Sequence, residues 1–298
     1  MYDLRTRLLS HALRPFTKTR LNEPYISQAF FRSLGEYVIS DLRNLTPSVL
    51  QEVRNARVLY IYSTSLAEFL EVYGRRISAQ CIFAGSTDLD FTDEGCLRLR
   101  SDKTLFLQNS YISDNDRIFT LPIGIEDYSK ALNGLKTLMK PKFNLDTKLP
   151  KLLVGPFSQT HPERQECIET LSGQENVITY NNLCSPREFA KLSSVHAFIA
   201  SPRGNGRDTH RIWESIYRRS VPVTLQDSWS ESLMLYQLPI ELLGKWSDWN
   251  SVTPLVRLKR FRGGEVSPVL WTSFWRNLIA CLTSSNQSAR KTIERLLA

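Results

Sequence analysis

The amino-acid sequence predicts an α/β fold of two domains, each built on a mainly parallel, doubly wound sheet. The first observation is an alternation of short apolar runs, typical of buried strands, with amphipathic stretches of helical spacing. The second is that this alternation weakens in the Lys-rich stretch 128–150 and then starts again. The third is the length of 298 residues, which is enough for two ordinary domains.

The first domain is predicted to cover residues 1–135. Residues 1–55 are basic and are expected to be helical, with one apolar face formed by Leu8, Leu9, Ala12 and Leu13. One further helix is expected at 65–76, ending near Gly74. Buried strands are predicted from runs of β-branched and aromatic residues at 56–64, 79–86, 104–110 and 117–126.

The second domain is predicted at 151–265, after a linker at 136–150. Its alternation starts with a strand at 151–157 and continues with a helix at 162–173, a strand at 176–180, a helix at 185–195 and strands at 196–202 and 221–225. Residues 266–298 are expected to form C-terminal helices. The aromatic-rich segment 268–282 is expected to pack back across the domains.

The charge balance favours an anionic partner, because 38 Lys and Arg outnumber 30 Asp and Glu and give a formal net charge of +8. Nucleic acid, an acidic membrane surface and a phosphorylated small molecule all satisfy that balance. The five cysteines are widely separated, with no CxxC pair, and are expected to be reduced thiols in a cytoplasmic protein. No apolar run approaches the ~20 residues of a bilayer-spanning helix. No cluster at metal-ligand spacing occurs, so no metal site is expected.

The segment SPRGNGRDTHRIWESIYRRSVPVT, residues 201–224, concentrates positive charge where a predicted strand passes into a predicted helix. Gly204 and Gly206 are expected to supply the dihedral angles of a tight turn. Asp208 or Thr209 is expected to cap the helix. The first helical turn would then present free N–H groups and the positive end of the helix dipole, an arrangement that favours phosphate.

Arginines surround this predicted anion site. A helix advances by about 100° per residue, which places a charged set on one face, namely Arg207, Arg211, Glu214 and Arg218. Arg203 precedes the turn, so Arg203, Arg207 and Arg211 are expected to add cationic forks around the phosphate. The alternative interpretation is a solvated helix face on which Arg211 and Arg218 pair with Glu214.

The segment resembles the signature of the exostosin-like glycosyltransferases, which have the GT-B fold of two Rossmann-like domains with a cleft between them. The shorter segments FAGSTDLDF, LFLQNS and LPIGIE resemble pieces of bacterial members in the same order, so the resemblance spans about residues 80–225. Two departures stand out. Ala84 to Asp88 replaces a His-Asn-Ser-Asp element, and Arg219 replaces the glycine that often ends the motif helix. Because a non-glycine left-handed cap costs about 1 kcal/mol, this helix is expected to end differently.

The resemblance implies transfer of a sugar, with inversion, from a nucleotide-diphosphate donor to an acceptor hydroxyl, without a catalytic metal or other cofactor. It assigns the diphosphate to Arg203 and Arg211, helped by the N–H groups of Gly204, Asn205 and Gly206. Glu214 would accept hydrogen bonds from the ribose. The remaining candidates for contact with the donor are Asp208, Thr209, His210 and Gly155.

The catalytic base is expected in the first domain, with Asp88 as the first choice and Asp90 as the second, because both follow a predicted strand at its carboxyl end. Asn109 and Gly124 follow two later strands and are candidates for the same crevice. The acidic pair has an alternative role in turn formation, and Asn109 has one in satisfying loop backbone.

The sequence thus predicts a cytoplasmic glycosyltransferase of surface polysaccharide or glycoconjugate synthesis, with a glycan or lipid-linked acceptor. Peripheral membrane contact through RLKRFRGG (257–264) and the N-terminal basic helix is a further expectation. Alternatives are a nucleotide-sugar epimerase, an inactive scaffold of the same fold, or a basic nucleic-acid-binding protein. No recognised nucleic-acid module occurs, so nucleic acid is not the expected partner.

Overall fold

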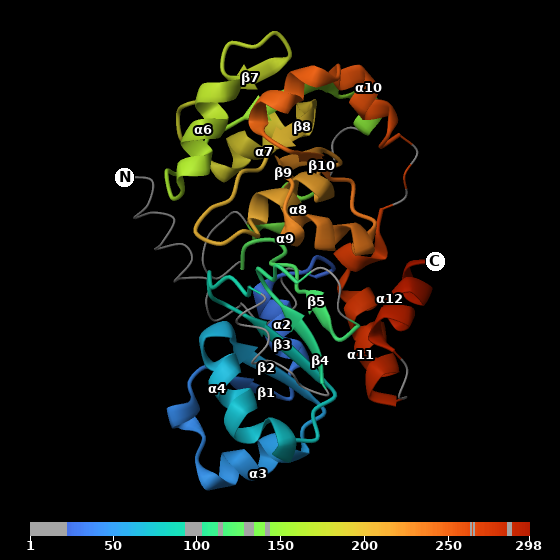
Figure 1. Cartoon of the computed structure of the whole chain (residues 1–298). Helices are drawn as coiled ribbons and strands as arrows, with labels where there is room; N and C mark the ends of the chain where they lie inside the picture. Colours follow the sequence, from blue (N-terminus) through green and yellow to red (C-terminus); the bar gives the residue numbers. More distant parts are fainter. Residues whose placement is uncertain are drawn as a thin grey trace.

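The computed structural model describes residues 23–92, 103–112, 116–127, 134–140, 144–262, 264, 266–284 and 288–298. It contains two sheets of five parallel strands each, with helices packed on them, and so confirms the predicted α/β class (Figure 1). The two sheets form two lobes, which are called the first and second lobe below. The predicted apolar helix face at residues 8–13 lies outside the described residues.

The first sheet has its strands in sequence order, β1-β2-β3-β4-β5. Their bounds are Tyr37–Ile39, Val58–Tyr62, Cys81–Gly85, Thr104–Leu107 and Ile118–Thr120. Helices α3 (Pro47–Asn55) and α4 (Ser63–Tyr73) pack a buried apolar cluster against one face. The expectation that residues 1–55 are helical is wrong at β1, where a three-residue edge strand pairs with β2. Pairing with β2 outweighs local helical spacing there.

The second sheet has the order β10-β9-β8-β6-β7, which is the doubly wound order 2-1-3-4-5 when read from β7. Its strands are β6 Leu149–Val154, β7 Val177–Thr179, β8 His196–Ala200, β9 Val221–Leu225 and β10 Glu241–Leu243. The chain direction across the sheet reverses between β6 and β8. This is the topological switch point at which open α/β sheets bind ligands.

Helices connect and cover the strands of the second lobe. Their bounds are α6 Pro162–Leu171, α7 Pro186–Val195, α8 His210–Tyr217, α9 Ser228–Ser232 and α10 Pro254–Lys259. Outside it lie α2 Gln28–Leu34, α11 Thr272–Ser284 and α12 Ala289–Leu297. Short 3-10 turns are Leu42–Asn44, Gly74–Arg76, Lys136–Leu138, Leu145–Thr147, Leu233–Tyr236, Trp246–Ser251 and Pro268–Leu270. Predicted helices 162–173 and 185–195 correspond to α6 and α7.

An aromatic core joins the C-terminal tail to the first lobe. Helices α11 and α12 lie beside that lobe in Figure 1. The Trp275 ring of α11 contacts the rings of Phe31 and Phe106, with centroids 5.0 and 5.7 Å apart. Helix α8 of the second lobe contributes Trp213 and Tyr217 to the same buried cluster. The tail therefore packs across both lobes, as the sequence predicts, and buried apolar surface of this extent restricts their relative motion.

The predicted linker, 136–150, includes residues that belong to the lobes. Met139 is fully buried in the aromatic core, and β6 begins at Leu149. Lys148 is also buried, and its Nζ donates hydrogen bonds to the carbonyls of Ser193 and Arg218. Burial lowers the pKa of Lys148 to about 7. The boundary of the second lobe thus lies slightly before the predicted residue 151.

Helix α8 ends on a left-handed residue without a glycine. Arg219 has φ of +60°, its N–H donates to the Ile216 carbonyl, and the Ser220 N–H donates to the Ser215 carbonyl. These two bonds form a Schellman motif. The expectation of a different helix end is therefore wrong. The chain keeps the motif with an arginine, which costs about 1 kcal/mol relative to glycine.

Candidate functional site

A cavity of about 460 Å³ lies at the switch point of the second sheet. Loops that follow β6 and β8 form two of its walls, and residues of the β7–α7 connection and α7 form a third. The first lobe closes it with Asp88, Ile123 and Glu126. Of the candidate residues predicted from the sequence, the cavity is lined by Asp88, Gly204, Asn205, Gly206, Asp208, Thr209, His210, Arg211 and Glu214.

The glycines of the β8–α8 loop serve a close approach of neighbouring groups. Neither Gly204 nor Gly206 has positive φ, so the predicted dihedral role is wrong. A Cβ at Gly204 would lie 2.7 Å from an Arg164 nitrogen, and one at Gly206 would lie 2.8 Å from Asn109 Nδ2. Because Gly204 and Gly206 have no side chains, Arg164 of the second lobe and Asn109 of the first lobe can both lie against this loop.

Arg211 is a partly buried cation on the wall of the cavity. Its guanidinium lies between two aromatic rings, 4.6 Å from the centroid of Phe157 and 4.3 Å from that of Phe189. Nη2 donates to the Pro156 carbonyl, whereas Nη1 is buried without an acceptor among the described residues. Burial lowers the pKa of Arg211 to about 10. Its positive charge is therefore poorly compensated within the protein, and a bound anion would compensate it.

Arg164, which the sequence reasoning missed, is a second cation at the cavity wall. It comes from α6, and its donors bond the carbonyls of Arg203 and Ser158. Burial lowers its pKa. No local pattern in PERQECIETL marks this arginine as part of a site, because its neighbours in the fold come from two distant loops.

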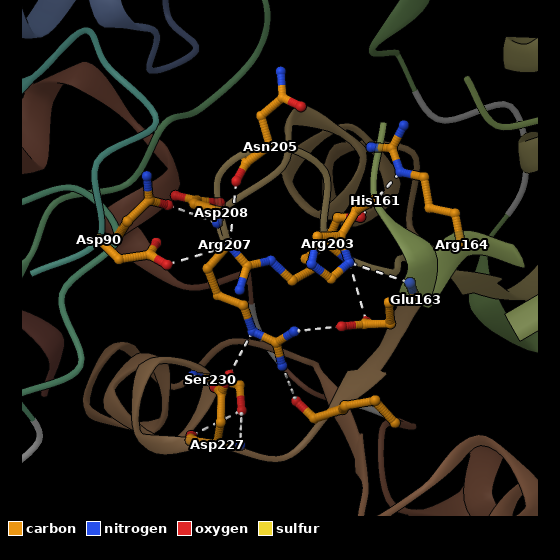
Figure 2. A network of polar contacts seen from close by, with 12 residues as sticks. Asp90, His161, Glu163, Arg164, Arg203, Asn205, Arg207, Asp208, Asp227 and Ser230 are labelled. Carbon is orange, nitrogen blue, oxygen red and sulfur yellow. Dashed lines mark hydrogen bonds and ion pairs between the residues drawn. The ribbon is translucent and has the colours of Figure 1, made fainter. Parts of the chain in front are cut away.

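Arg203 and Arg207 do not line the cavity, contrary to expectation. Both belong to the polar network of Figure 2. Arg203 reaches across to the first lobe, where its Nη2 lies 3.2 Å from the Asp90 carboxylate. Arg207 is buried and pairs with Glu163 and Asp227. Arg207 therefore stabilises the second lobe, and Arg203 joins the lobes.

Asp208 also joins the lobes. It is 4% exposed and accepts hydrogen bonds from the Ile123 N–H and from Trp213 Nε1, both at 2.7 Å. Its own N–H donates to Asn109 Oδ1. The predicted cap is thus wrong for Asp208. Thr209 occupies the N-cap position but makes no side-chain cap bond, and its buried hydroxyl has no partner among the described residues.

Burial raises the pKa of Asp208 to about 7 from an ordinary value of 3.8. The folded protein therefore holds this proton in a range where the unfolded chain has released it. Stability from the protonated form is complete below pH 3.8 and is lost as the pH rises toward 7. The Asp208→Asn variant lacks this titrating group. We expect the unfolding free energy of the wild type, relative to that of the variant, to fall by roughly 2 kcal/mol between pH 5 and pH 8. Urea unfolding at both pH values measures it, and an unchanged difference would contradict the shift.

Acidic groups from the first lobe also line the cavity. Asp88 is exposed and lines the cavity, whereas Asp90 does not line it and is held by Arg203. Glu126, which the sequence reasoning did not select, also lines it and lies 3.4 Å from His210 Nε2. The other ring nitrogen, His210 Nδ1, lies 2.8 Å from the Gly124 carbonyl. Asp88 is therefore the better placed of the two predicted bases.

Three other predicted positions have mainly structural contacts. Glu214 lines the cavity but is buried and pairs with Arg218 at 3.3 Å. The alternative interpretation predicted this pair, but its solvated helix face is wrong, because Glu214 and Arg218 are both buried. Gly155 has φ of +81° and approaches the Tyr180 carbonyl, so it shapes the loop. It does not line the cavity, whereas Pro156, Phe157 and Ser158 do. Asn109 is fully buried and satisfies the Asp208 backbone.

Comparison with known proteins adds no family assignment. No protein-family model matches the chain. No curated protein matches it either. Among the described residues, no three His, Cys, Asp or Glu side chains converge as a metal site would require, and no helix has the length and apolar character to cross a membrane.

Another wall of the cavity is apolar. The sequence indicated the loop after β6 that contains Phe157, but not Leu183, Cys184 or Phe189. Phe157 follows β6, and Phe189 lies on α7. Leu183, which is 74% exposed, and Cys184 precede α7 at the same cavity. An apolar wall beside cationic and hydroxyl donors suits a ligand with an anionic part and a flat or apolar part. The fold brings two loops and helix α7 together to form this wall.

Proposed function

We propose that the chain is a glycosyltransferase of GT-B architecture that transfers a sugar from a nucleotide-diphosphate donor to an acceptor hydroxyl, with inversion. The donor would occupy the cavity between the lobes, and the acceptor, a glycan or a lipid-linked sugar, would approach from the side of Asp88. The resemblance of residues 201–224 to exostosin-like enzymes supports the reaction class. The site geometry supports an anionic donor.

The observation that carries the proposal is the set of unsatisfied donors at the switch-point cavity. Arg211 Nη1 and the Thr209 hydroxyl are buried there without protein partners among the described residues. Thr209 makes no side-chain cap bond to α8. The Ile212 N–H of the first turn donates to the Thr209 carbonyl, which leaves the N–H groups of His210 and Arg211 available to a ligand. Buried donors without acceptors are costly, and a diphosphate would supply acceptors for all of them.

The proposed reaction uses these groups in two ways. The acceptor oxygen attacks the anomeric carbon while the bond to the diphosphate oxygen breaks, and the bonding electron pair leaves on the diphosphate. Arg211 and the α8 amides would stabilise that charge. The acceptor proton would pass to the carboxylate of Asp88. The proposed donor-binding groups belong to the second lobe and the proposed base belongs to the first. The donor and the acceptor would therefore be handled by different lobes.

Calorimetric titration with nucleoside diphosphates of different bases tests the proposal. We expect one of them to bind with a stoichiometry of one and to protect Cys184, which lines the cavity, from alkylation by maleimide. Alkylation of Cys281, which lies on α11 away from the cavity, provides the internal control. Absence of binding for every diphosphate, or binding that leaves Cys184 alkylation unchanged, would refute a donor in this cavity.

A further inference from the structure

A second cavity, of about 450 Å³, lies at the opposite end of the second sheet. It is bordered by the end of α8 and the start of β9, whereas the first cavity adjoins the ends of β6 and β8. Its floor includes Ile216, Val221 and Leu238, each of which is at most 5% exposed. The floor is therefore apolar.

Arginines form the rim of this cavity. Arg219, Arg260 and Arg262 all line it. Arg262 pairs with Asp146, and Arg260 lies 3.4 Å from Glu241, but both remain about half exposed. Arg219 is exposed and takes part in no ion pair among the described residues. The rim thus keeps an excess of positive charge.

Two residues with left-handed backbone lie at this cavity. Four described residues other than glycine have positive φ, and two of them, Arg219 and Gln237, line this cavity. Such residues persist where the surrounding structure or a function requires them. Glycine would relieve the strain at position 219 and would remove the rim cation.

The outward face of α10 also combines apolar and basic side chains. Pro254, Arg257 and Leu258 are buried, and the exposed face carries Leu255, Val256, Lys259 and Arg260. Leu255 is 57% exposed and Val256 is 49% exposed. This helix lies at the end of the second lobe remote from the first lobe (Figure 1). Aliphatic side chains one turn from basic ones are typical of surfaces that lie on an anionic bilayer.

We propose that the second cavity and the outward face of α10 bind an anionic phospholipid at a bilayer surface. Its apolar chain would cover the floor at Ile216 and Leu238, and its phosphate would lie among the rim arginines. A small soluble anion would leave the apolar floor unused, and a neutral apolar molecule would desolvate the arginines without compensation. The proposal is independent of the function proposed for the first cavity.

Vesicle co-sedimentation tests the proposal on the full chain. We expect binding to phosphatidylcholine vesicles that contain phosphatidylglycerol and no binding to phosphatidylcholine alone. Arg219→Gly should weaken that binding roughly fivefold, as the loss of one cation near an anionic surface predicts. The same variant should be at least as resistant to urea as the wild type, because glycine relieves the left-handed backbone. If Arg219 had only a structural role, the variant would lose vesicle binding only together with resistance to urea.

Two further variants complete the design. Leu255→Ser combined with Val256→Ser changes only exposed side chains and should weaken vesicle binding roughly tenfold. Arg75→Gln removes one exposed cation from the first lobe and should leave binding unchanged. Binding that none of the α10 and Arg219 variants affects would place the membrane contact elsewhere, residues 1–22 included, and would overturn the proposal.

A phosphatidylglycerol with a photoreactive acyl chain distinguishes lipid in the cavity from adsorption at the surface. We expect cross-linked peptides to contain Leu238 or Phe261, which line the cavity. Competition by inorganic phosphate at equal concentration should not abolish cross-linking. Cross-links confined to other peptides, or complete loss with phosphate alone, would overturn the proposal.

Discussion

An Arg211→Met variant is expected to fold normally and to bind the nucleoside diphosphate at least roughly 30-fold more weakly than the wild type. Methionine fills the space beside the Phe157 and Phe189 rings. It supplies neither the positive charge nor the N–H donors of the guanidinium group. Removing one partner of a buried charged pair costs about 2–5 kcal/mol of binding free energy, which corresponds to this loss. Calorimetric titration of both proteins with the same diphosphate measures it.

The variant is expected to lose affinity for the diphosphate without a matching loss of folding stability. The folded protein pays for the desolvation of Arg211, as the lowered pKa of its guanidinium indicates. An apolar side chain of similar volume avoids that cost, so the unfolding free energy should stay within about 1 kcal/mol of the wild type or rise. Arg75→Met, on the exposed surface of the first lobe, is the matched control and should change neither quantity. Unaltered affinity in Arg211→Met would remove this residue from the site.

The fold was predictable where strands are buried on both faces. Runs such as VLYIY in β2 and AFIA in β8 are continuously apolar, and a parallel sheet covered by helices requires that pattern. The three-residue β1 was not predictable, because it is too short for a pattern and depends on pairing with β2. The same reason explains β10, which pairs with β9 over three residues.

Only part of the site was predictable. The β8–α8 loop carries its own signature, and His210, Arg211 and Glu214 line the cavity. Arg164 comes from a segment with no signature, and the fold alone brings it and Phe157 to the cavity beside Arg211. The same signature misled the assignment of Arg203 and Arg207.

Carboxylate partners explain that error. Charge spacing in a sequence shows where cations are but not where their partners lie. Glu163, Asp90 and Asp227 are distant in sequence and satisfy the two arginines in the fold. Arg211, in contrast, has no carboxylate within ion-pair distance among the described residues. The residue left without a carboxylate is the one that an anionic ligand would contact.

An Asp88→Asn variant is expected to lower kcat by about 10²- to 10⁴-fold, the usual contribution of a general base. Asparagine keeps the shape of the side chain but cannot accept the acceptor proton. Because Asp88 belongs to the first lobe and is not one of the proposed donor-binding groups, the affinity for the nucleoside diphosphate should stay unchanged. Steady-state kinetics with the donor identified by calorimetry, together with an acceptor that yields product, measure the change.

Asp90→Asn and Glu126→Gln provide the matched comparison, because both remove a carboxylate from the same end of the first lobe. Asp90 is paired with Arg203 and Glu126 lies beside His210, so their loss should disturb contacts between the lobes and lower kcat less than Asp88→Asn does. Since a base must be free to reach the acceptor, the exposed carboxylate should dominate. A larger loss of kcat in either of these variants than in Asp88→Asn would transfer the role of base to that residue and leave the donor site of the second lobe intact.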